Sequence, residues 1–486
     1  MSQYNISGPV NIIRLEGKID GIKKIIYLFM DIHNPENEQT KCSTPSLEIE
    51  EFLKNNFNNL INYNKYYDFF VEFQPGTFLL PKKKQWYNRN IYLDRVLRFF
   101  KKYLNYNPTS NEVKTSKIFK NIRFHYIDIR DWLEYYIFEI IGQLFILLYI
   151  ESKNEYTINN IIKLLDMIID ELYRIKSFIQ QPKIVKDSHI ILEELPSISI
   201  ALKPDIQKRI VEKIRYLIGK FLLKINNKKI KNIINEYVNI IIIPEFNKII
   251  KIMKNLKTSV NGNQSIPKQY NYVGVNNPIP NTKICLNNKK CLSSAIYRDI
   301  APESCTGARS SAICGELQGY TASLRSIRDN LSQNDRLSED IAPKPLGAKS
   351  FKRNINNNNF HILYNDLMQI NDIEIIPLFA QLMDIYFLRR FLDKKYITNA
   401  IVYVGSAHAA IYIDILVNLF NFKITHASLA ITNNINKINK LVRKLHPFKS
   451  GMHYHKITDN ILNIFLPLKN KIIQCSNISS FPKNFE

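Results

Sequence analysis

Cysteine and acidic residues are sparse in this chain of 486 residues, and it has neither a secretory leader nor a long apolar run. The first eleven residues are polar and lack the apolar segment of a signal peptide. The nearest candidate for a membrane span, residues 135–150, is interrupted by Glu139 and Gln143. Six cysteines are too few for a disulfide framework in so long a chain. These absences predict a soluble intracellular protein with reduced thiols and no membrane span.

Recognisable nucleic-acid signatures are also missing, because no helix-turn-helix, zinc-finger or RNA-binding motif occurs. The balance of 67 Lys and Arg against 43 Asp and Glu nevertheless leaves a formal charge of +24. Such an excess predicts attraction to polyanions such as nucleic acid, anionic lipid or acidic protein. The basic residues are mostly scattered, which favours a solvated surface over a polyanion-binding one. Both interpretations stay open at this point.

What the chain does contain is the composition of a large globular protein, with 45% hydrophobic and 12% aromatic residues. Apolar strand-like runs at 10–16 and 23–32 flank Asp20-Gly21, a hairpin signal. Helical spacing follows over 44–61. A strand over 68–73, a helix over 91–104 and a strand over 123–129 come next. Alternation of strands and helices predicts an α/β fold with a mainly parallel central sheet.

Composition divides the remainder of the chain into three parts. Residues 132–257 read as a helical insertion or cap over the sheet, divided by Pro182, Pro196, Pro204 and Pro244. Residues 258–352 are rich in Ser, Gly, Asn and Pro, which predicts a mostly disordered insert. Residues 353–486 return to helical and strand-like patterns. A strand and a turn end at His408, and further strands are predicted at 422–427 and 461–468. We therefore expect 1–131 and 353–486 to form the two halves of one α/β core.

Titratable side chains stand where several of the predicted strands end. Residues 401–408, with the sequence IVYVGSAH, deliver His408 after a Gly-Ser turn. Asp31 and His33 follow the second strand, Glu72 ends the strand over 68–73, and Arg130 follows the last. In parallel α/β sheets the ligand crevice lies beyond the carboxyl ends of the strands. We therefore expect these side chains to share one pocket.

A histidine and a glutamate in one crevice suit general acid–base catalysis, because imidazole titrates near neutrality and a carboxylate can activate water. The second histidine would polarise a carbonyl group or hold a metal, and Arg123 or Arg130 would stabilise an oxyanion. His33, Glu72, His408 and Arg130 are the predicted catalytic residues. If a divalent transition metal binds, Asp31, His33 and His408 are its predicted ligands; no other cofactor-binding residues are predicted.

The G-x-x-H sequence of residues 405–408 resembles a motif of the Tiki/TraB, ChaN-like and erythromycin-esterase superfamily. Residues 30–33 resemble a first copy in which Met30 stands where glycine is usual, and Glu72 occupies the position of that superfamily's strand-end glutamate. The resemblance implies an α/β hydrolase with helical insertions. It implies metal dependence in the Tiki branch, metal-free catalysis in the esterase branch, or haem binding in a related branch, and a small-molecule or peptide substrate.

Two rival functions remain open. Asp31-x-His33 also resembles the opening motif of calcineurin-like metallophosphoesterases, and residues 451–455 resemble their closing G-H-x-H. The middle motifs of that family are absent. A non-catalytic basic protein that binds nucleic acid or acidic partners is the other alternative. The bias towards Asn, Ile and Lys resembles proteins of large DNA viruses, which would place the protein in the host cytoplasm or the virion.

Overall fold

The computed structural model describes thirteen stretches of the chain: 5–34, 38–61, 63–72, 92–103, 105–107, 112–114, 118–130, 135–149, 155–180, 225–262, 357–445, 454–466 and 473–486. The predicted disordered insert, 258–352, lies almost entirely outside these residues, as do Pro182, Pro196 and Pro204.

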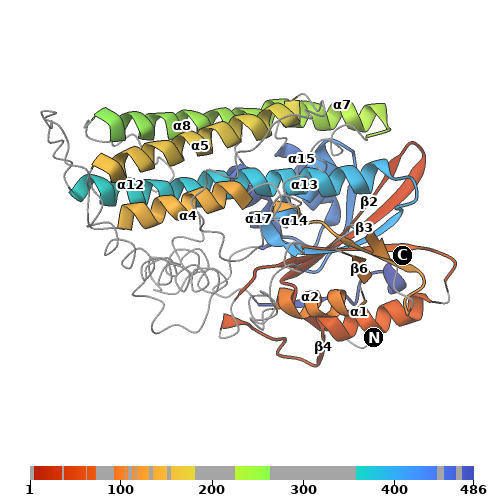
Figure 1. The fold of residues 1–486 in the computed structure, drawn as a ribbon. Helices are drawn as coiled ribbons and strands as arrows, with labels where there is room; N and C mark the ends of the chain where they lie inside the picture. The colour runs from red at the N-terminus through yellow and green to blue at the C-terminus, as the bar shows by residue number, and fades with distance from the viewer. Residues whose placement is uncertain are drawn as a thin grey trace, which may run out of the picture.

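A six-stranded sheet forms the centre of the molecule, in the order β10-β2-β3-β9-β5-β8 (Figure 1). Its strands are β2 (Asn11–Ile19), β3 (Ile22–Asp31), β5 (Tyr67–Val71), β8 (Ile122–Tyr126), β9 (Asn399–Gly405) and β10 (Lys423–Ala427). The pairs β3–β9, β9–β5 and β5–β8 are parallel, whereas β10–β2 and β2–β3 are antiparallel. The C-terminal strand β9 thus lies between two N-terminal strands, and the predicted α/β core assembled from both ends of the chain is confirmed.

The β2–β3 hairpin is formed as the sequence predicts. Its turn consists of Asp20 and Gly21, with φ of 48° and 78°, and Ile19 pairs with Ile22 across it. Positive φ at both turn residues is the requirement of the tight hairpin turn that matches strand twist. This turn fixes the register of β3, and so determines which residue ends that strand.

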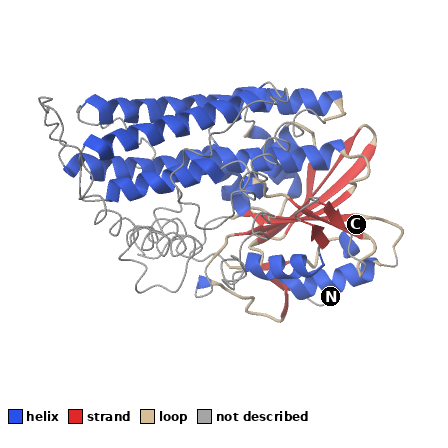
Figure 2. Cartoon of the chain, in the orientation of Figure 1, coloured by secondary structure: helices blue, strands red, loops and turns tan. Residues whose placement is uncertain are grey.

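Helices cover both faces of the sheet (Figures 1 and 2). On one face lie α1 (Ile49–Leu60) and α2 (Tyr92–Tyr103); on the other lie α13 (Ile376–Asp393), α14 (Ser406–Asn418), α15 (Ile435–Lys444) and α17 (Tyr454–Phe465). Residues 461–468, predicted as a strand, instead belong in part to α17. A short apolar run does not distinguish a strand from a buried helical face, and Ile457, Ile461 and Phe465 keep the helical spacing of the buried side.

A bundle of long helices extends beyond the sheet (Figure 2). It contains α4 (Tyr135–Tyr149), α5 (Glu155–Gln180), α7 (Lys228–Tyr237), η6 (Val238–Ile242), α8 (Ile243–Gly262), α12 (Asn357–Ile370) and η8 (Asn371–Ile375). Pro244 was expected to separate two helices, but α7, η6 and α8 are continuous. The wider π-helical turn of η6 ends two residues before the proline and accommodates its missing N–H. Pro377 follows η8 in the same way. No helix in the described residues is long and apolar enough to cross a lipid bilayer.

Smaller elements complete the described chain. They are β1 (Asn5–Ser7), β4 (Ser46–Glu48), β6 (Asn105–Asn107), β7 (Glu112–Lys114), β11 (Cys475–Asn477) and the 3₁₀ helix η9 (Lys483–Phe485). β11, β1 and β4 form a second, three-stranded sheet. β4 occupies the start of the segment predicted to be helical from residue 44, and α1 begins only at Ile49.

A disulfide joins Cys42 to Cys475 beside this second sheet, 433 residues apart in sequence. The expectation that all thiols are reduced is therefore wrong for these two cysteines. Cysteine counting failed because it detects dense frameworks and carries no information on a single long-range pair. The other four cysteines lie outside the described residues.

Reduction of this disulfide is expected to destabilise the protein, because the bond closes a very long loop in the unfolded chain. The expected loss in the free energy of unfolding is about 2–4 kcal/mol. Thermal unfolding with and without a reducing agent measures it, and a Cys42→Ser, Cys475→Ser double variant should show the lower melting temperature in both conditions. Equal melting temperatures for the wild type in both conditions would contradict the expectation.

Candidate active site at the carboxyl edge of the sheet

The predicted strand-end residues meet at one edge of the sheet. In the sheet, β3, β9, β5 and β8 are adjacent and run in the same direction, so their carboxyl ends are neighbours. Asp31 pairs with Gly405, and the N–H of Glu72 donates to the carbonyl of Tyr403, 3.1 Å away. Glu72 therefore extends from β5 at the middle of this edge, with His408 following the adjacent strand β9 and His33 following β3 on the far side of β9.

Glu72 lies between the two imidazole rings. Its Oε2 is 3.4 Å from Nε2 of His33, and its Oε1 is 3.5 Å from Nε2 of His408. Arg130 donates to Oε1 at 2.9 Å, and the backbone N–H of Gly405 donates to Oε2 at 2.8 Å. The carboxylate is thus buried and surrounded by donors from three other strand ends.

Each histidine is oriented by a second carboxylate on its other ring nitrogen. Nδ1 of His33 is 2.6 Å from Oδ2 of Asp31, and Nδ1 of His408 is 2.6 Å from Oδ1 of Asp384. Both carboxylates are almost completely buried. Because each Nδ1 is held in this way, both rings present Nε2 to Glu72.

Asp384 was not predicted. It lies within the apolar helix α13, which packs beside α14. The only signal in the sequence was a carboxylate in a helix whose neighbours are almost all hydrophobic. Such a residue is rarely left unpaired when buried, but its partner, 24 residues away, is determined only by the packing of the two helices.

The Arg130 guanidinium is fixed by Asp128. Arg130 donates Nε to Oδ1 of Asp128 at 2.9 Å and Nη2 to its Oδ2 at 2.7 Å. Asp128 follows β8 by two residues and also accepts the backbone N–H of Arg130 at 3.0 Å. A bidentate pair of this kind restricts the orientation of the guanidinium. The positive charge of Arg130 is therefore held in place beside the Glu72 carboxylate.

The surroundings shift the pKa of all three central groups. Burial lowers the pKa of His33, but the hydrogen bond and charge of Asp31, with those of Glu72, outweigh it and raise the pKa to about 10. For His408, burial is likewise outweighed by Asp384 and Glu72, and the pKa is about 10. Burial raises the pKa of Glu72, but the positive charge of His408 and the contact with His33 hold it well below its usual value. The resting site therefore contains two imidazolium rings and an ionised glutamate.

Gly405 is required by space rather than by its backbone conformation. Its φ is −54°, which any residue adopts. A Cβ at this position would lie 3.0 Å from Nε2 of His33 and 3.3 Å from Oε2 of Glu72. The glycine of the G-x-x-H motif thus allows His33 and Glu72 to meet.

The two G-x-x-H-like segments are not structurally equivalent. Met30 pairs with Val404 in the sheet and is buried in the core, so the residue opposite Gly405 is Asp31. His408 is in the first turn of α14, whereas His33 lies beyond the end of β3 with a φ of 52°. The two rings therefore approach Glu72 from different local backbone conformations, one helical and one left-handed.

Arg123 takes no part in this site. It donates Nε and Nη2 to Asp68 at 2.7 and 2.6 Å, near the amino end of the same strands. Asp68 also lies 2.7 Å from Nε2 of His125, whose Nδ1 is 2.9 Å from Arg390. Burial and the charge of Arg390 lower the pKa of His125 to about 4. This second cluster connects Asp68 of β5 to Arg390 of α13 through the neutral imidazole ring of His125.

The proposed metal ligands do not form one set. Asp31 contacts Nδ1 of His33, whereas His408 faces the same ring from the Nε2 side, across Glu72. Among the described residues, no group of three or more His, Cys, Asp and Glu side chains has a geometry suited to a metal ion. Residues 451–453, which belong to the phosphoesterase-like motif, lie outside the described residues.

Comparison with known proteins finds relatives in a large DNA virus, in agreement with the composition. The chain is 29% identical over 497 residues to "Uncharacterized protein R706" of Acanthamoeba polyphaga mimivirus, covering 99% of this chain and 97% of the relative. It is 31% identical over 516 residues to "Uncharacterized protein R160" of the same virus, covering 99% and 97%. No solved structure matches. The model of the Family of unknown function (DUF5847) matches residues 4–287 and 330–486, and the chain belongs to that family.

Proposed function

We propose that the protein is a hydrolase of esters or amides in small molecules or peptides, with Glu72 as general base and His33 as general acid. The observation that carries this proposal is the position of Glu72 between two imidazole Nε2 atoms, each ring fixed through Nδ1 by a buried carboxylate. The resemblance to the Tiki/TraB, ChaN-like and erythromycin-esterase superfamily supports the same class of reaction. The proposed reaction uses only side chains of this chain and no metal, as in the esterase branch of that superfamily.

The two histidines have different roles. The side chain of His33 is 35% exposed, whereas that of His408 is 7% exposed. Only His33 is accessible to a substrate. His408 contributes a buried positive charge that keeps Glu72 ionised, and Arg130 donates to the same carboxylate oxygen, Oε1.

In the proposed reaction, Glu72 removes a proton from a water molecule as the water oxygen attacks the carbonyl carbon. The negative charge that develops on the carbonyl oxygen is stabilised by the nearby imidazolium and guanidinium groups. When the bond to the leaving group breaks, Nε2–H of His33 protonates the departing oxygen or nitrogen. The proton on Glu72 then passes to Nε2 of His33, 3.4 Å away, and both groups return to their resting states.

The pH dependence of hydrolysis tests these assignments, because the reaction requires ionised Glu72 and protonated His33. The pKa of Glu72 is held well below its usual value and that of His33 is about 10. We therefore expect kcat/KM to be flat through neutral pH and to fall as the pH rises through about 10. Initial rates with alkyl esters, whose alkoxide leaving groups require protonation, give this profile when acid release is followed by titration at constant pH and corrected for the uncatalysed reaction. A rate that instead rises with an apparent pKa near 6.5 would identify a neutral imidazole base and contradict the proposal.

A further inference from the structure

Two exposed helices carry lysines at helical spacing. Lys251, Lys254 and Lys257 follow one side of α8 in the helical bundle, and α15, beside the sheet, carries a second row. The second row consists of Lys437, Lys440 and Lys444, at i, i+3 and i+7, and we refer to it as the α15 lysine row. The two rows have equal numbers of charges but different surroundings.

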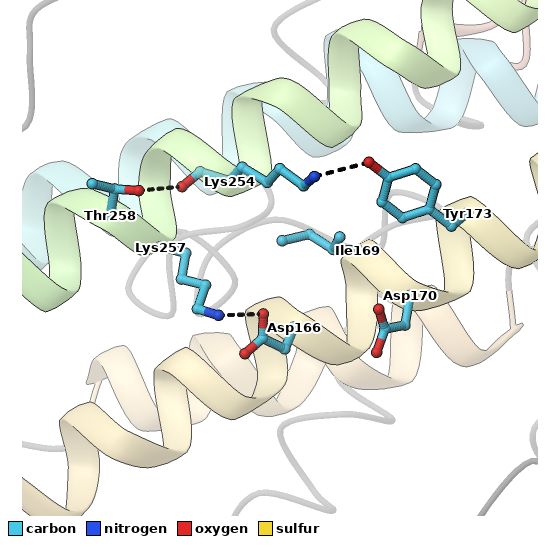
Figure 3. A pocket seen from close by; sticks show the side chains of 7 residues that line it. All are labelled: Asp166, Ile169, Asp170, Tyr173, Lys254, Lys257 and Thr258. Atoms are coloured by element: carbon cyan, nitrogen blue, oxygen red, sulfur yellow. Dashed lines mark hydrogen bonds and ion pairs between the residues drawn. The ribbon is translucent and has the colours of Figure 1, made fainter.

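Two lysines of the row on α8 have partners on α5 (Figure 3). Lys257 pairs with Asp166 of α5 at 2.6 Å, and Lys254 donates to the hydroxyl of Tyr173 at 2.8 Å. These residues, with Asp170 of α5, line an open groove of about 590 Å³ between the two helices. Lys254 and Lys257 therefore contribute to the packing of α8 against α5.

The α15 lysine row has no such compensation. No ion pair joins any of its three lysines to an acidic side chain in the described part of the chain. In the sequence, residues 415–458 contain no Asp or Glu at all, but seven Lys and Arg. Within the described residues, Arg443, which is also exposed on α15, donates to the neutral oxygens of Asn421 and Phe422 and pairs with no carboxylate. The positive charge on this face is thus available to an external anion.

The fold holds α15 firmly. Asn439 accepts from the N–H of Ile424 at 2.9 Å and donates to its carbonyl at 2.8 Å, which fixes the helix beside β10. Ile438 and Val442 are buried against the core, and the side chain of Asn434 caps the first turn. One side of α15 is therefore packed against the core, and the lysines project from the opposite, exposed side.

We propose that the α15 lysine row binds the phosphate backbone of nucleic acid. Lysine ammonium groups contact phosphates as point charges, and a row along one helix can neutralise successive phosphates. The exposed positions of α15 are Asn436, the three lysines and Arg443. No exposed apolar side chain on the helix is available to insert into a bilayer, and no aromatic residue is available to stack on bases. Binding through this face is therefore independent of base sequence.

Fluorescence anisotropy with a labelled DNA duplex of about 20 base pairs tests this surface, because the salt dependence of binding counts neutralised phosphates. With Arg443 and the three lysines engaged, the slope of log K against log [NaCl] is expected to be about −3.6. The triple variant Lys437→Gln, Lys440→Gln, Lys444→Gln should bring the slope to about −1 and weaken binding at low salt at least about tenfold. All three side chains are exposed, so circular dichroism should be unchanged.

The matched control is Lys251→Gln, Lys254→Gln, Lys257→Gln on α8, which removes the same formal charge. It should leave the slope and affinity close to those of the wild type. Absence of DNA binding by the wild type at low salt, or equal losses in both triple variants, would overturn the proposal. So would binding of the wild type to phosphatidylserine vesicles with none to the duplex.

Discussion

Replacement of His33 by Asn is expected to lower kcat/KM for ester hydrolysis by about 10²- to 10⁴-fold, the contribution of a positioned general acid. Asn cannot protonate a leaving group. It is the appropriate replacement because His33 has a φ of 52°, in the left-handed region that Asn tolerates better than most residues. The backbone should therefore tolerate the replacement, but Asp31 and Glu72 lose a cationic partner, so the melting temperature should also fall. The loss of kcat is measured at a temperature at which the variant is fully folded.

His426→Asn is the matched control for this experiment. His426 lies on β10 of the same sheet, is partly exposed, and contacts Thr425 and Phe481 instead of a carboxylate. This variant should hydrolyse the same substrates at the wild-type rate. An equal loss in both variants, or full activity in His33→Asn, would remove His33 from the mechanism.

Glu72→Gln is expected to abolish activity and also to destabilise the fold by about 3–5 kcal/mol, the range for removal of one partner from a buried ion pair. Glu72 is the shared counter-charge of His33, His408 and Arg130. A neutral amide of the same shape leaves these cations close together without it. Chemical denaturation of the variant and the wild type measures the difference.

Glu16→Gln gives the corresponding control on β2. Glu16 also pairs with two cations, Arg14 and Lys23, but its side chain is 35% exposed. Exposed ion pairs contribute about 0–1 kcal/mol, so this variant should be nearly as stable as the wild type. If Glu72→Gln unfolds at the same denaturant concentration as Glu16→Gln, Glu72 is not the electrostatic centre of the site.

The sequence was sufficient to predict which strands carry the site, because local signals decide where a strand ends. Asp20-Gly21 fixes the hairpin that precedes β3, and Gly405 with Ser406 ends β9. Parallel strands bring their carboxyl ends to one edge, so His33, Glu72 and His408 were expected to be neighbours. The structure places Nε2 of His33 and Nε2 of His408 each within 3.5 Å of a carboxylate oxygen of Glu72.

Contacts that depend on packing between distant segments were not predictable in this way. Asp384 reaches His408 only because α13 packs beside α14, and Cys42 meets Cys475 only through the second sheet. The choice between Arg123 and Arg130 was open because both lie close to β8. One projects at the amino end of the strand, where Asp68 holds it, and the other follows the carboxyl end.

Titration of the histidine rings by NMR, in protein labelled selectively at histidine, tests the coupling of two imidazoles through one carboxylate most directly. In the wild type, two rings should titrate near pH 10, in accordance with the raised pKa of His33 and His408. Variants His33→Asn and His408→Asn assign them. In Glu72→Gln, the pKa of both rings should fall together. Two rings that titrate near 6.5 and do not respond to Glu72→Gln would contradict the account.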